Sequence, residues 1–331
     1  MHKVGIIGCG GMGRGHSGNL AAIPGVEIAA TTDKSPVAAE ALAKVYGAKA
    51  YADTGALLDS APVDIVVICT PTNAHAEAAI AAAQHGKHIL TEKPLARTLE
   101  QADQVIAAVE KAGVRMLVGH VLRFFPEYVT AKHLLDGGQV GRPGVCRTTR
   151  ASHHPRGSDD WFADYEKSGG VVLDMLIHDF DLVRWYFGEV ECVYCRGLAY
   201  AGLDHTDYAL ITLRHASRVI THVEASWALP AGNFMTKLEI AGDGGLLDFD
   251  NESSVPLKVL RKQTGDALAP GVMVPESPVA KNPYALEDEH FISCLDSGAP
   301  FAVSPQDGRA ALAIGLAALE SARTGQPVRP G

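Results

Sequence analysis

The sequence predicts an α/β protein, with a doubly wound parallel sheet in its N-terminal part and a second domain of the α+β class. Three observations predict this fold. Short runs of β-branched residues alternate with alanine-rich stretches of helical spacing over roughly the first 120 residues. Glycines follow several of these helical stretches. Beyond about residue 121, strand-like runs follow one another closely, as they do in antiparallel sheets.

The N-terminal elements alternate between strand and helix. Five strands are expected at residues 4–7, 26–31, 65–69, 88–91 and 115–119, and four helices at 17–22, 36–46, 75–85 and 99–112. Gly47, Gly86 and Gly113 each come directly after one of these helices, where a residue with positive φ ends a helix. Strands joined by helices form a parallel sheet, and we assign residues 1–121 to this domain.

Residues 122–331 are assigned to the second domain. Six strands are expected at residues 145–151, 191–200, 208–214, 218–227, 236–241 and 246–250, separated by turn residues. Two helices, at residues 286–297 and 305–323, close the chain. Closely spaced strands followed by helices predict an α+β domain with an antiparallel sheet.

Composition limits the class of partner. The chain has 331 residues, of which 47% are apolar and 20% charged, and its net charge is −9. An acidic balance lacks the excess of cations that nucleic-acid binding uses. The longest apolar run is about half a membrane span, and no signal-like segment precedes the first strand. Six scattered cysteines suit a reducing compartment. We therefore expect a cytoplasmic protein without nucleic-acid or membrane partners.

A glycine-rich loop joins the first strand to the first helix. Gly8, Gly10, Gly11, Met12 and Gly13 belong to the segment Gly-Cys-Gly-Gly-Met-Gly, which has the spacing G-x-G-x-x-G. Glycines in such a loop permit a tight turn, the approach of backbone amides to a pyrophosphate, and close packing of helix on strand. The positive end of the helix attracts the phosphates. The loop therefore predicts a dinucleotide site.

Asp33 supports this prediction and bears on the choice of cofactor. It lies 20 residues after Gly13, at the end of the second predicted strand, where a carboxylate can accept hydrogen bonds from both ribose hydroxyls of an adenosine. The same carboxylate would repel the 2′-phosphate of NADP, so NAD is the expected cofactor. The neighbouring Lys34 and Ser35 are residue types that commonly bind a phosphate group, which leaves NADP as the alternative.

Two segments carry candidate catalytic groups. Lys93 follows a predicted strand, so it is expected at the carboxyl edge of the sheet, where ligands bind in doubly wound folds. A turn lysine exposed to solvent is the alternative. In a helix, Asp174, His178 and Asp181 fall at i, i+4 and i+7 and form one polar stripe on an otherwise apolar segment. Such a stripe indicates a lined cavity.

Two other interpretations of this stripe compete with a catalytic one. Two carboxylates and an imidazole could bind a metal ion, although the other clustered imidazoles, His153 and His154, are adjacent and cannot easily face one ion. The stripe could also be the solvated face of an amphipathic helix. We expect no metal site.

These motifs together resemble those of the Gfo/Idh/MocA oxidoreductases. The resemblance rests on the glycine loop, on Cys-Thr-Pro-Thr-Asn at residues 69–73 with His75, on residues 86–96 around Glu92 and Lys93, and on Gly169-Gly170 with Asp174-x-x-x-His178. It implies a Rossmann domain followed by a domain with a large, open, mainly antiparallel sheet, whose free face commonly forms the dimer or tetramer contact in such proteins.

The resemblance also implies roles for individual residues. The cofactor would lie along the glycine loop, Asp33 and a set that comprises Thr70, Pro71, Asn73, His75, Glu92 and Lys93. Lys93, Asp174 and His178 match the catalytic positions of the family. An imidazole suits removal of a hydroxyl proton, and a cation stabilises a developing alkoxide. We assign removal of the hydroxyl proton to His178 and stabilisation of the alkoxide to Lys93. Asp174 would orient Lys93 or the substrate hydroxyl. Lys93 remains an alternative candidate for the base.

Substrate-facing candidates are Arg123 with its neighbour Phe124, His153, His154, Trp161 and Tyr284. Each of them could instead be a core aromatic or a solvated loop residue. With Lys93 in one domain and Asp174 and His178 in the other, the active site is expected in the cleft between the domains.

The function expected from these residues is hydride transfer between NAD and a CH–OH carbon of a sugar, polyol or cyclitol, with myo-inositol as the first compound to test. One alternative is a glycosidase that oxidises its substrate transiently with bound NAD. Another is a sugar-sensing regulator without catalysis, which the presence of Lys93, Asp174 and His178 together argues against. A homodimer or homotetramer is expected.

Overall fold

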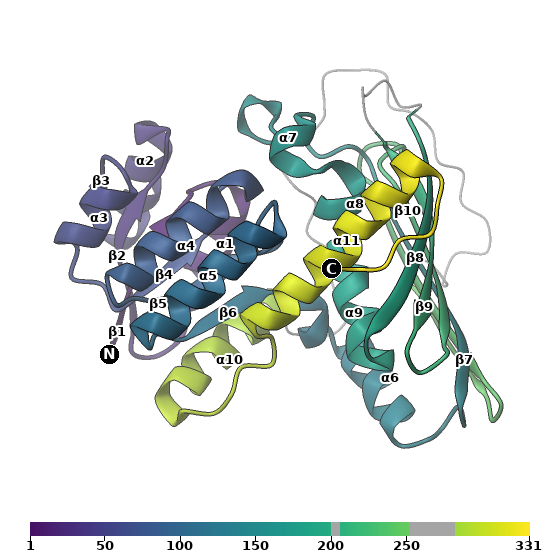
Figure 1. Ribbon diagram of the computed structural model, residues 1–331. Coiled ribbons are helices and arrows are strands. Elements are labelled where there is room, and N and C mark those ends of the chain that lie inside the picture. The colour runs from purple at the N-terminus through teal and green to yellow at the C-terminus, as the bar shows by residue number, and fades with distance from the viewer. Residues whose placement is uncertain (200–205, 252–281) are drawn as a thin grey trace. The chain divides into compact units, whose positions relative to one another are not determined.

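The computed structural model describes residues 1–199, 206–251 and 282–331 (Figure 1). The chain divides into two compact units, Met1–Phe124 with Ser277–Arg309, and Phe125–Glu276 with Ala310–Gly331. The sequence places one boundary near residue 121 and assigns all later residues to the second domain. In the structure the segment Ser277–Arg309 instead returns to the first unit, because the helix within it contributes to the core of that unit.

The first unit contains a six-stranded parallel sheet in the order β3-β2-β1-β4-β5-β6. Its strands are β1 His2–Ile7, β2 Val26–Thr32, β3 Lys49–Tyr51, β4 Ile65–Ile68, β5 His88–Glu92 and β6 Met116–Gly119. This is the order of dinucleotide-binding sheets, with the direction of winding reversing between β1 and β4. Ligands bind outside the carboxyl ends of the strands at that reversal. The five strands expected from sequence are present, and only the three-residue β3 was not expected.

Helices connect these strands: α1 Gly11–Ala21, α2 Pro36–Tyr46, α3 Thr54–Ser60, the 3₁₀ turn η1 Thr72–Ala74, α4 His75–Gln84 and α5 Leu99–Ala112. Their ends follow local chemistry. The side chains of Ser35, Asp53 and Thr98 accept hydrogen bonds at the N-termini of α2, α3 and α5. Gly47 and Gly113 end α2 and α5 in the left-handed conformation, as their positions predict.

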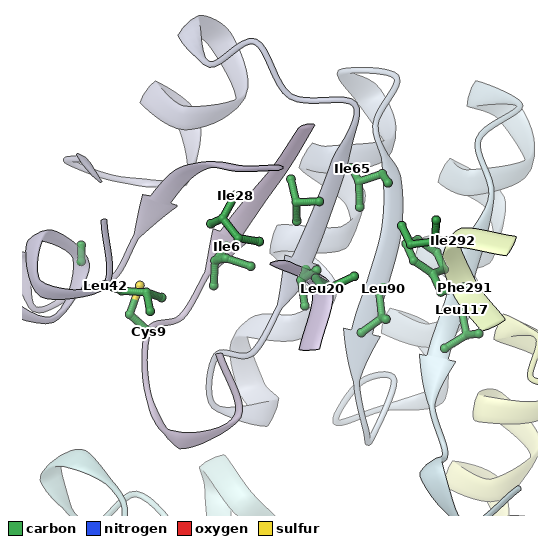
Figure 2. Packing of buried hydrophobic residues seen from close by; sticks show 13 residues of the cluster. Ile6, Cys9, Leu20, Ile28, Leu42, Ile65, Leu90, Leu117, Phe291 and Ile292 are labelled. Carbon is green, nitrogen blue, oxygen red and sulfur yellow. The ribbon is translucent and has the colours of Figure 1, made fainter. Parts of the chain in front are cut away.

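A hydrophobic cluster fills the first unit between its sheet and its helices (Figure 2). It includes Val4 and Ile6 of β1, Leu20 of α1, and Leu90 of β5, each fully buried. Phe291 and Ile292 of helix α10, Pro283–Ser297, belong to the same cluster. A segment from late in the chain therefore completes the core of the N-terminal sheet, and burial of these apolar side chains is its main stabilisation.

The second unit is built on a six-stranded sheet in the order β12-β11-β7-β10-β9-β8. Its strands are β7 Pro143–Ser152, β8 Val190–Leu198, β9 Tyr208–His215, β10 Ile220–Ser226, β11 Phe234–Gly242 and β12 Leu246–Asp250. All neighbours pair antiparallel except β7 and β10, which are parallel. The prediction of an α+β region with a large, mainly antiparallel sheet is confirmed.

The remaining helices and turns are η2 Val121–Phe124, α6 Pro126–Asp136, η3 Ser158–Asp160, α7 Tyr165–Ser168, α8 Gly170–Asp174, α9 Ile177–Phe187 and α11 Pro305–Thr324. Helix α8 contacts strands β9 and β10, so one face of the second sheet is covered. A Cβ on Gly315 of α11 would lie 2.5 Å from Leu173 of α8 and 3.4 Å from Phe180 of α9. The absence of a side chain at Gly315 therefore lets these three helices pack closely.

The two faces of this sheet differ in burial. Along β9 and β10 the residues alternate, with Ile211, Leu213 and Val223 completely buried. The opposite face exposes apolar side chains, including Leu210 at 46% and Ile220 at 41% of their surface. Alternation with a period of two is typical of an antiparallel sheet with one covered face.

An ion pair is buried in the second unit. Arg150 of β7 donates from Nε to Asp179 Oδ2 of α9 at 2.6 Å, and both side chains are only 2% exposed. Burying two charges in this way is tolerated because each compensates the other. The pair therefore ties the sheet to helix α9.

We expect Asp179→Asn to lower the free energy of unfolding by about 3–5 kcal/mol, because it leaves the Arg150 guanidinium buried without a countercharge. Urea denaturation followed by circular dichroism measures the change. The exposed pair between Arg323 and Glu320 provides the control, and Glu320→Gln should leave the midpoint unchanged. Equal midpoints for Asp179→Asn and the unchanged protein would contradict the expected role of the pair.

Candidate functional site

The glycines of the loop after β1 fall into two groups. Gly8 has φ +97°, and a Cβ there would lie 2.6 Å from the Cys69 carbonyl group. A Cβ on Gly13 would lie 2.0 Å from the Gly8 carbonyl oxygen. These two glycines let the loop pack against the end of β4 and let α1 pack against the loop. Gly10 and Gly11 differ, because a Cβ on either would have no neighbour within 4 Å among the described residues.

This geometry fits a dinucleotide pyrophosphate. Gly10 and Gly11 are exposed, Met12 is half-buried, and helix α1 begins at Gly11. The first four amides of a helix have no intrahelical partner, and its dipole favours an anion. An anion can approach the backbone of Gly10 and Gly11 because no side chain fills the space in front of it.

Asp33 lies directly after β2, beside the same loop. Its Oδ2 accepts a hydrogen bond from the Cys9 amide at 2.7 Å, and its Oδ1 accepts one from the Ser35 amide at 2.8 Å. A carboxylate offers about four acceptor sites, so each oxygen can accept a further hydroxyl proton. The two backbone bonds fix the carboxylate where it can bind the ribose of an adenosine.

The loop after β4 contributes polar groups next to the glycine loop. The Thr70 hydroxyl oxygen is buried, and the described residues provide it with no hydrogen-bond partner. Pro71 precedes the 3₁₀ turn η1, which contains the exposed Asn73. A buried polar group without a partner is costly, and a bound ligand can satisfy it. Thr70 and Asn73 therefore fit the predicted role in holding the cofactor.

His75 contacts the protein itself on both sides of its ring. Its Nε2 lies 2.8 Å from the Thr70 carbonyl oxygen and its Nδ1 lies 2.7 Å from the Pro94 carbonyl oxygen. Burial lowers the pKa of His75, and the two carbonyl groups oppose this effect. His75 thus connects the loop after β4 to the turn after β5, where Lys93 lies.

Lys93 follows β5 at the carboxyl edge of the sheet, as its position in the sequence predicts. Its backbone amide donates a hydrogen bond to Glu92 Oε2 at 3.1 Å, and its peptide bond to Pro94 is cis. Glu92 is 6% exposed, whereas Lys93 is half-buried. The backbone of this turn is thus held by Glu92 on one side of Lys93 and by His75 at Pro94 on the other.

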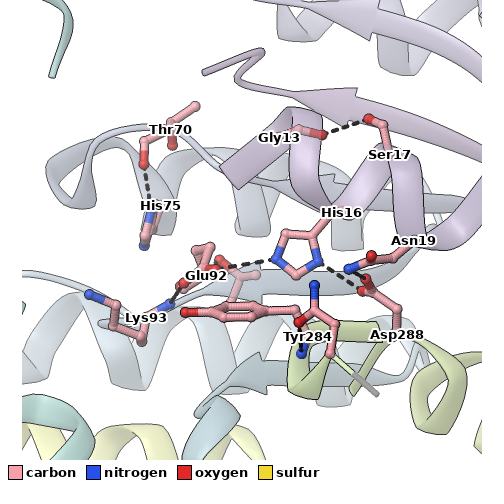
Figure 3. A network of polar contacts seen from close by, with 12 residues as sticks. Gly13, His16, Ser17, Asn19, Thr70, His75, Glu92, Lys93, Tyr284 and Asp288 are labelled. Atoms are coloured by element: carbon pink, nitrogen blue, oxygen red, sulfur yellow. Dashed lines mark hydrogen bonds and ion pairs between the residues drawn. The ribbon is translucent and has the colours of Figure 1, made fainter. Parts of the chain in front are cut away.

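His16 and Asp288 lie next to this turn, and no motif in the sequence identifies them. His16 of α1 contacts Glu92 through Nε2 and Asp288 of α10 through Nδ1 (Figure 3). A sequence signal does exist for Asp288. It lies on the same face of α10 as the buried Phe291 and Ile292, and a carboxylate on an apolar helix face requires a partner. The partner lies 272 residues away in sequence, so the pairing itself cannot be derived from spacing.

The second unit carries Asp174 and His178. The sequence suggests one helix with a polar stripe, but the structure has two helices, with Asp174 as the last residue of α8 and His178 as the second of α9. Met175 and Leu176 separate the two helices, so regular helical spacing holds between His178 and Asp181 but not between these residues and Asp174. Asp174 is 9% exposed and Asp181 is completely buried. The solvated-face interpretation of the stripe is therefore wrong.

No group of three or more histidine, cysteine, aspartate or glutamate side chains has an arrangement suited to a metal ion in residues 1–199, 206–251 and 282–331. Within the same ranges, no helix has the length and hydropathy of a membrane span.

The substrate candidates lie in different places. Arg123 in the first unit is 8% exposed and donates to the Ala302 carbonyl oxygen at 2.7 Å, with Asp307 3.4 Å from its guanidinium. These contacts are typical of a side chain that fixes the start of α11. Phe124 packs on the His290 ring. Tyr284, also in the first unit, packs edge-on against the His16 ring at 6.2 Å.

The other three candidates lie in the second unit. His153 pairs with Ala228 in an isolated bridge, and His154 packs edge-on against the buried Trp227. Trp161 stacks on Phe162 with ring centroids 3.9 Å apart. Their role toward a substrate stays a prediction.

Known protein families that match this chain include a dinucleotide-binding domain, as the geometry of the glycine loop suggests. Residues 2–120 match the model of an oxidoreductase family with an NAD-binding Rossmann fold, and residues 128–248 match the GFO/IDH/MocA C-terminal domain. The chain belongs to the Gfo/Idh/MocA oxidoreductase family. This finding confirms the resemblance noted from the motifs, the oxidoreductase class and NAD as the cofactor.

Relatives match the chain over almost its whole length. It is 32% identical to myo-inositol 2-dehydrogenase of Thermotoga maritima over 327 residues, 96% of each chain. It is 31% identical to the NAD⁺-dependent scyllo-inositol 2-dehydrogenase of Bacillus subtilis, covering 98% of this chain and 95% of the relative. The crystal structure of GenD2 from gentamicin A biosynthesis, in complex with NAD, aligns with a TM-score of 0.88 at 26% identity, over 100% of this chain and 96% of that one.

The two groups of glycines give a direct test of the nucleotide loop. We expect Gly10→Ala to leave the melting temperature almost unchanged but to weaken NADH binding about tenfold or more, because the methyl group occupies the space in front of the helix. Gly13→Ala should instead lower the melting temperature, because its Cβ meets backbone. Calorimetry and fluorescence titration with NADH measure both effects. Unchanged NADH affinity in Gly10→Ala would place the pyrophosphate elsewhere.

Asp33 is expected to decide between the two nicotinamide cofactors. Asp33→Ser removes the charge that repels a 2′-phosphate and leaves Lys34 in place, so the ratio of the NADPH to the NADH dissociation constant should fall about tenfold. Fluorescence titration gives both constants without any substrate. Glu27→Gln, which changes an exposed carboxylate on the same strand, is the control. A starting protein that binds NADPH more tightly than NADH would overturn the expectation.

Proposed function

We propose that this protein oxidises a CH–OH group of a cyclitol or sugar, with myo-inositol as the first substrate to test. The observation that carries the proposal is the placement of Lys93. It lies at the carboxyl end of β5, next to the loop after β4 in a sheet of dinucleotide-binding order. Full-length relatives named as inositol 2-dehydrogenases support the substrate class.

The residue types suit alcohol oxidation. Bound NAD supplies the acceptor for the hydride that leaves the carbinol carbon. Removal of the hydroxyl proton completes the oxidation, and we assign this proton to the imidazole of His178. The Lys93 ammonium stabilises the negative charge that develops on the oxygen. Asp174, which is buried at the end of α8, orients the substrate hydroxyl or Lys93.

We further propose that the protein is cytoplasmic and assembles as a homodimer or homotetramer through the outer face of the second sheet. The six cysteines are all free, as expected in a reducing compartment. The outer face exposes Leu198, Leu210, Ile220 and Leu246, from four of its strands. Exposed apolar residues gathered on one face support a contact with a second copy.

The activity is tested with a panel of cyclitols, aldoses and their phosphates, by the absorbance of NADH. We expect NADH formation with myo-inositol. Lys93→Ala and His178→Ala should each lower turnover by about 10² or more with little change in NADH affinity, because both act on the reacting oxygen.

Matched controls are Lys111→Ala and His133→Ala, which alter exposed side chains and should leave turnover unchanged. Full turnover in both Lys93→Ala and His178→Ala would refute the assigned roles. Cleavage of a glycoside without net NADH would favour the glycosidase alternative, and NADH binding without turnover on the whole panel would favour a regulator.

A further inference from the structure

Three ionisable side chains from distant parts of the sequence meet inside the first unit. They are His16 of α1, Glu92 of β5 and Asp288 of α10 (Figure 3). The His16 and Asp288 side chains are completely buried, and that of Glu92 is 8% exposed. Burying charged groups is costly, so a cluster of this kind persists only if its members satisfy one another.

The hydrogen bonds of His16 define its protonation state. His16 Nδ1 lies 2.8 Å from Asp288 Oδ1, and His16 Nε2 lies 3.2 Å from Glu92 Oε1. An ionised carboxylate only accepts hydrogen bonds, so both ring nitrogens must donate, and this requires an imidazolium. Burial lowers the pKa of His16, but the charge of Asp288 and the hydrogen bonds of both carboxylates outweigh it, and the pKa lies well above 6.5.

The second oxygen of each carboxylate is also used. Glu92 Oε2 accepts the backbone N–H of Lys93 at 3.1 Å, and Asp288 Oδ2 accepts from Asn19 Nδ2 at 3.0 Å. Asn19 lies on the same helix as His16, one turn later. His16 and Asn19 therefore fix Asp288 from α1, and His16 fixes the plane of the Glu92 carboxylate. Glu92 in turn holds the amide of Lys93.

Few other groups face the imidazolium in the described part of the chain. The Tyr284 ring packs edge-on against it from α10, and the Cys69 thiol at the end of β4 lies close enough to affect its pKa. Burial raises the pKa of Cys69 to about 12, so this thiol stays neutral. The charge of His16 is therefore balanced by Glu92 and Asp288.

We propose that His16 is a positioning residue for catalysis, which acts through Glu92 to fix the backbone of Lys93. The inference rests on the proposed function, in which Lys93 stabilises the developing alkoxide. A small displacement of that turn would move the ammonium away from the reacting oxygen, and displacements near 1 Å can cost about 10²-fold in rate.

A purely structural role would not require these residue types. Apolar side chains of similar volume can hold two helices against a sheet as well as a buried ionic cluster does, without the cost of desolvation. The Glu92 carboxylate supplies an acceptor aimed at the Lys93 N–H, and the His16 imidazolium favours the ionised form of that carboxylate and fixes its orientation.

The first test separates positioning from folding. His16→Gln should lower kcat by about 10- to 100-fold and leave the NADH dissociation constant within about threefold, because the glycine loop is unaltered. A merely structural role would weaken NADH binding as well, because His16 and the loop share helix α1. Glu92→Gln should reproduce the loss of kcat, and the double variant should be no slower than the slower single one, since both act on one contact.

His85→Gln is the control, because it changes an exposed histidine of the same unit and should keep kcat within about threefold. Two readouts do not depend on turnover. The ¹⁵N spectrum of His16 in the full-length, NAD-bound protein should show both ring nitrogens protonated at neutral pH. The Lys93 amide should exchange with solvent at least about tenfold faster in Glu92→Gln, and in His16→Gln if that variant folds.

Either of two results would overturn the inference. One is a neutral His16 ring in the unchanged protein. The other is that Glu92→Gln has the same kcat and the same rate of Lys93 amide exchange as the unchanged protein. Absence of turnover in the unchanged protein would refute the proposed function instead, while the spectrum and the amide exchange would still report on His16. The two failures are therefore distinguishable.

Discussion

The buried carboxylate of Glu92 is the constraint on which the arrangement of the first unit depends. It lies at the carboxyl end of β5, the edge at which sheets of this kind bind ligands, and its burial there requires hydrogen-bond donors. His16 supplies one such donor from α1 through Nε2, and its Nδ1 contacts Asp288 of α10. Helix α10 must therefore pack in the first unit, although 272 residues separate Asp288 from His16. This requirement and the burial of Phe291 together explain why Ser277–Arg309 belong to the first unit.

In the glycine loop of this unit, closely packed backbone lies next to backbone that has free space in front of it. Gly8 and Gly13 are required because the chain is packed too closely there for any Cβ, whereas Gly10 and Gly11 leave space for a ligand. His75 holds the loop after β4 to the Lys93–Pro94 turn. Packing thus fixes the groups that are predicted to hold the cofactor and keeps side chains out of the space in front of Gly10 and Gly11, which is what preorganisation of a binding site requires.

Local patterns predicted most of the fold. Short runs of β-branched and other apolar residues located five of the six strands of the first sheet, and closely spaced strand-like runs between turn residues located all six of the second. The three-residue β3 buries too little to show a period. The break at Met175–Leu176 between α8 and α9 carries no glycine or proline, so an uninterrupted helix was the natural expectation. The return of α10 to the first unit depends on contacts that no local pattern encodes.

The residues of the candidate site likewise fall into those that local sequence patterns reveal and those that they do not. The glycine loop, Asp33 and Lys93 could be proposed from the sequence because their chemistry is local, in that each lies at the end of a predicted strand. His16 and Asp288 were missed because a buried ion cluster is defined by partners that are distant in sequence. The sequence offers one signal, which is a charged residue on a periodic apolar helix face, as Asp288 is on α10. This pattern predicts that the residue has a partner but does not identify the partner.

The net charge of −9 shows why local geometry decides the binding of an anionic cofactor here. Charges more than a Debye length away, about 8 Å at physiological salt, are largely screened, so the overall acidity of the chain has little effect at the glycine loop. The groups that can act there are the amides at the start of α1, the Lys93 ammonium and the Glu92–His16–Asp288 cluster, in which one imidazolium faces two carboxylates. Because His16 offsets one of the two buried carboxylates, the cluster adds far less negative potential beside Lys93 than two free carboxylates would.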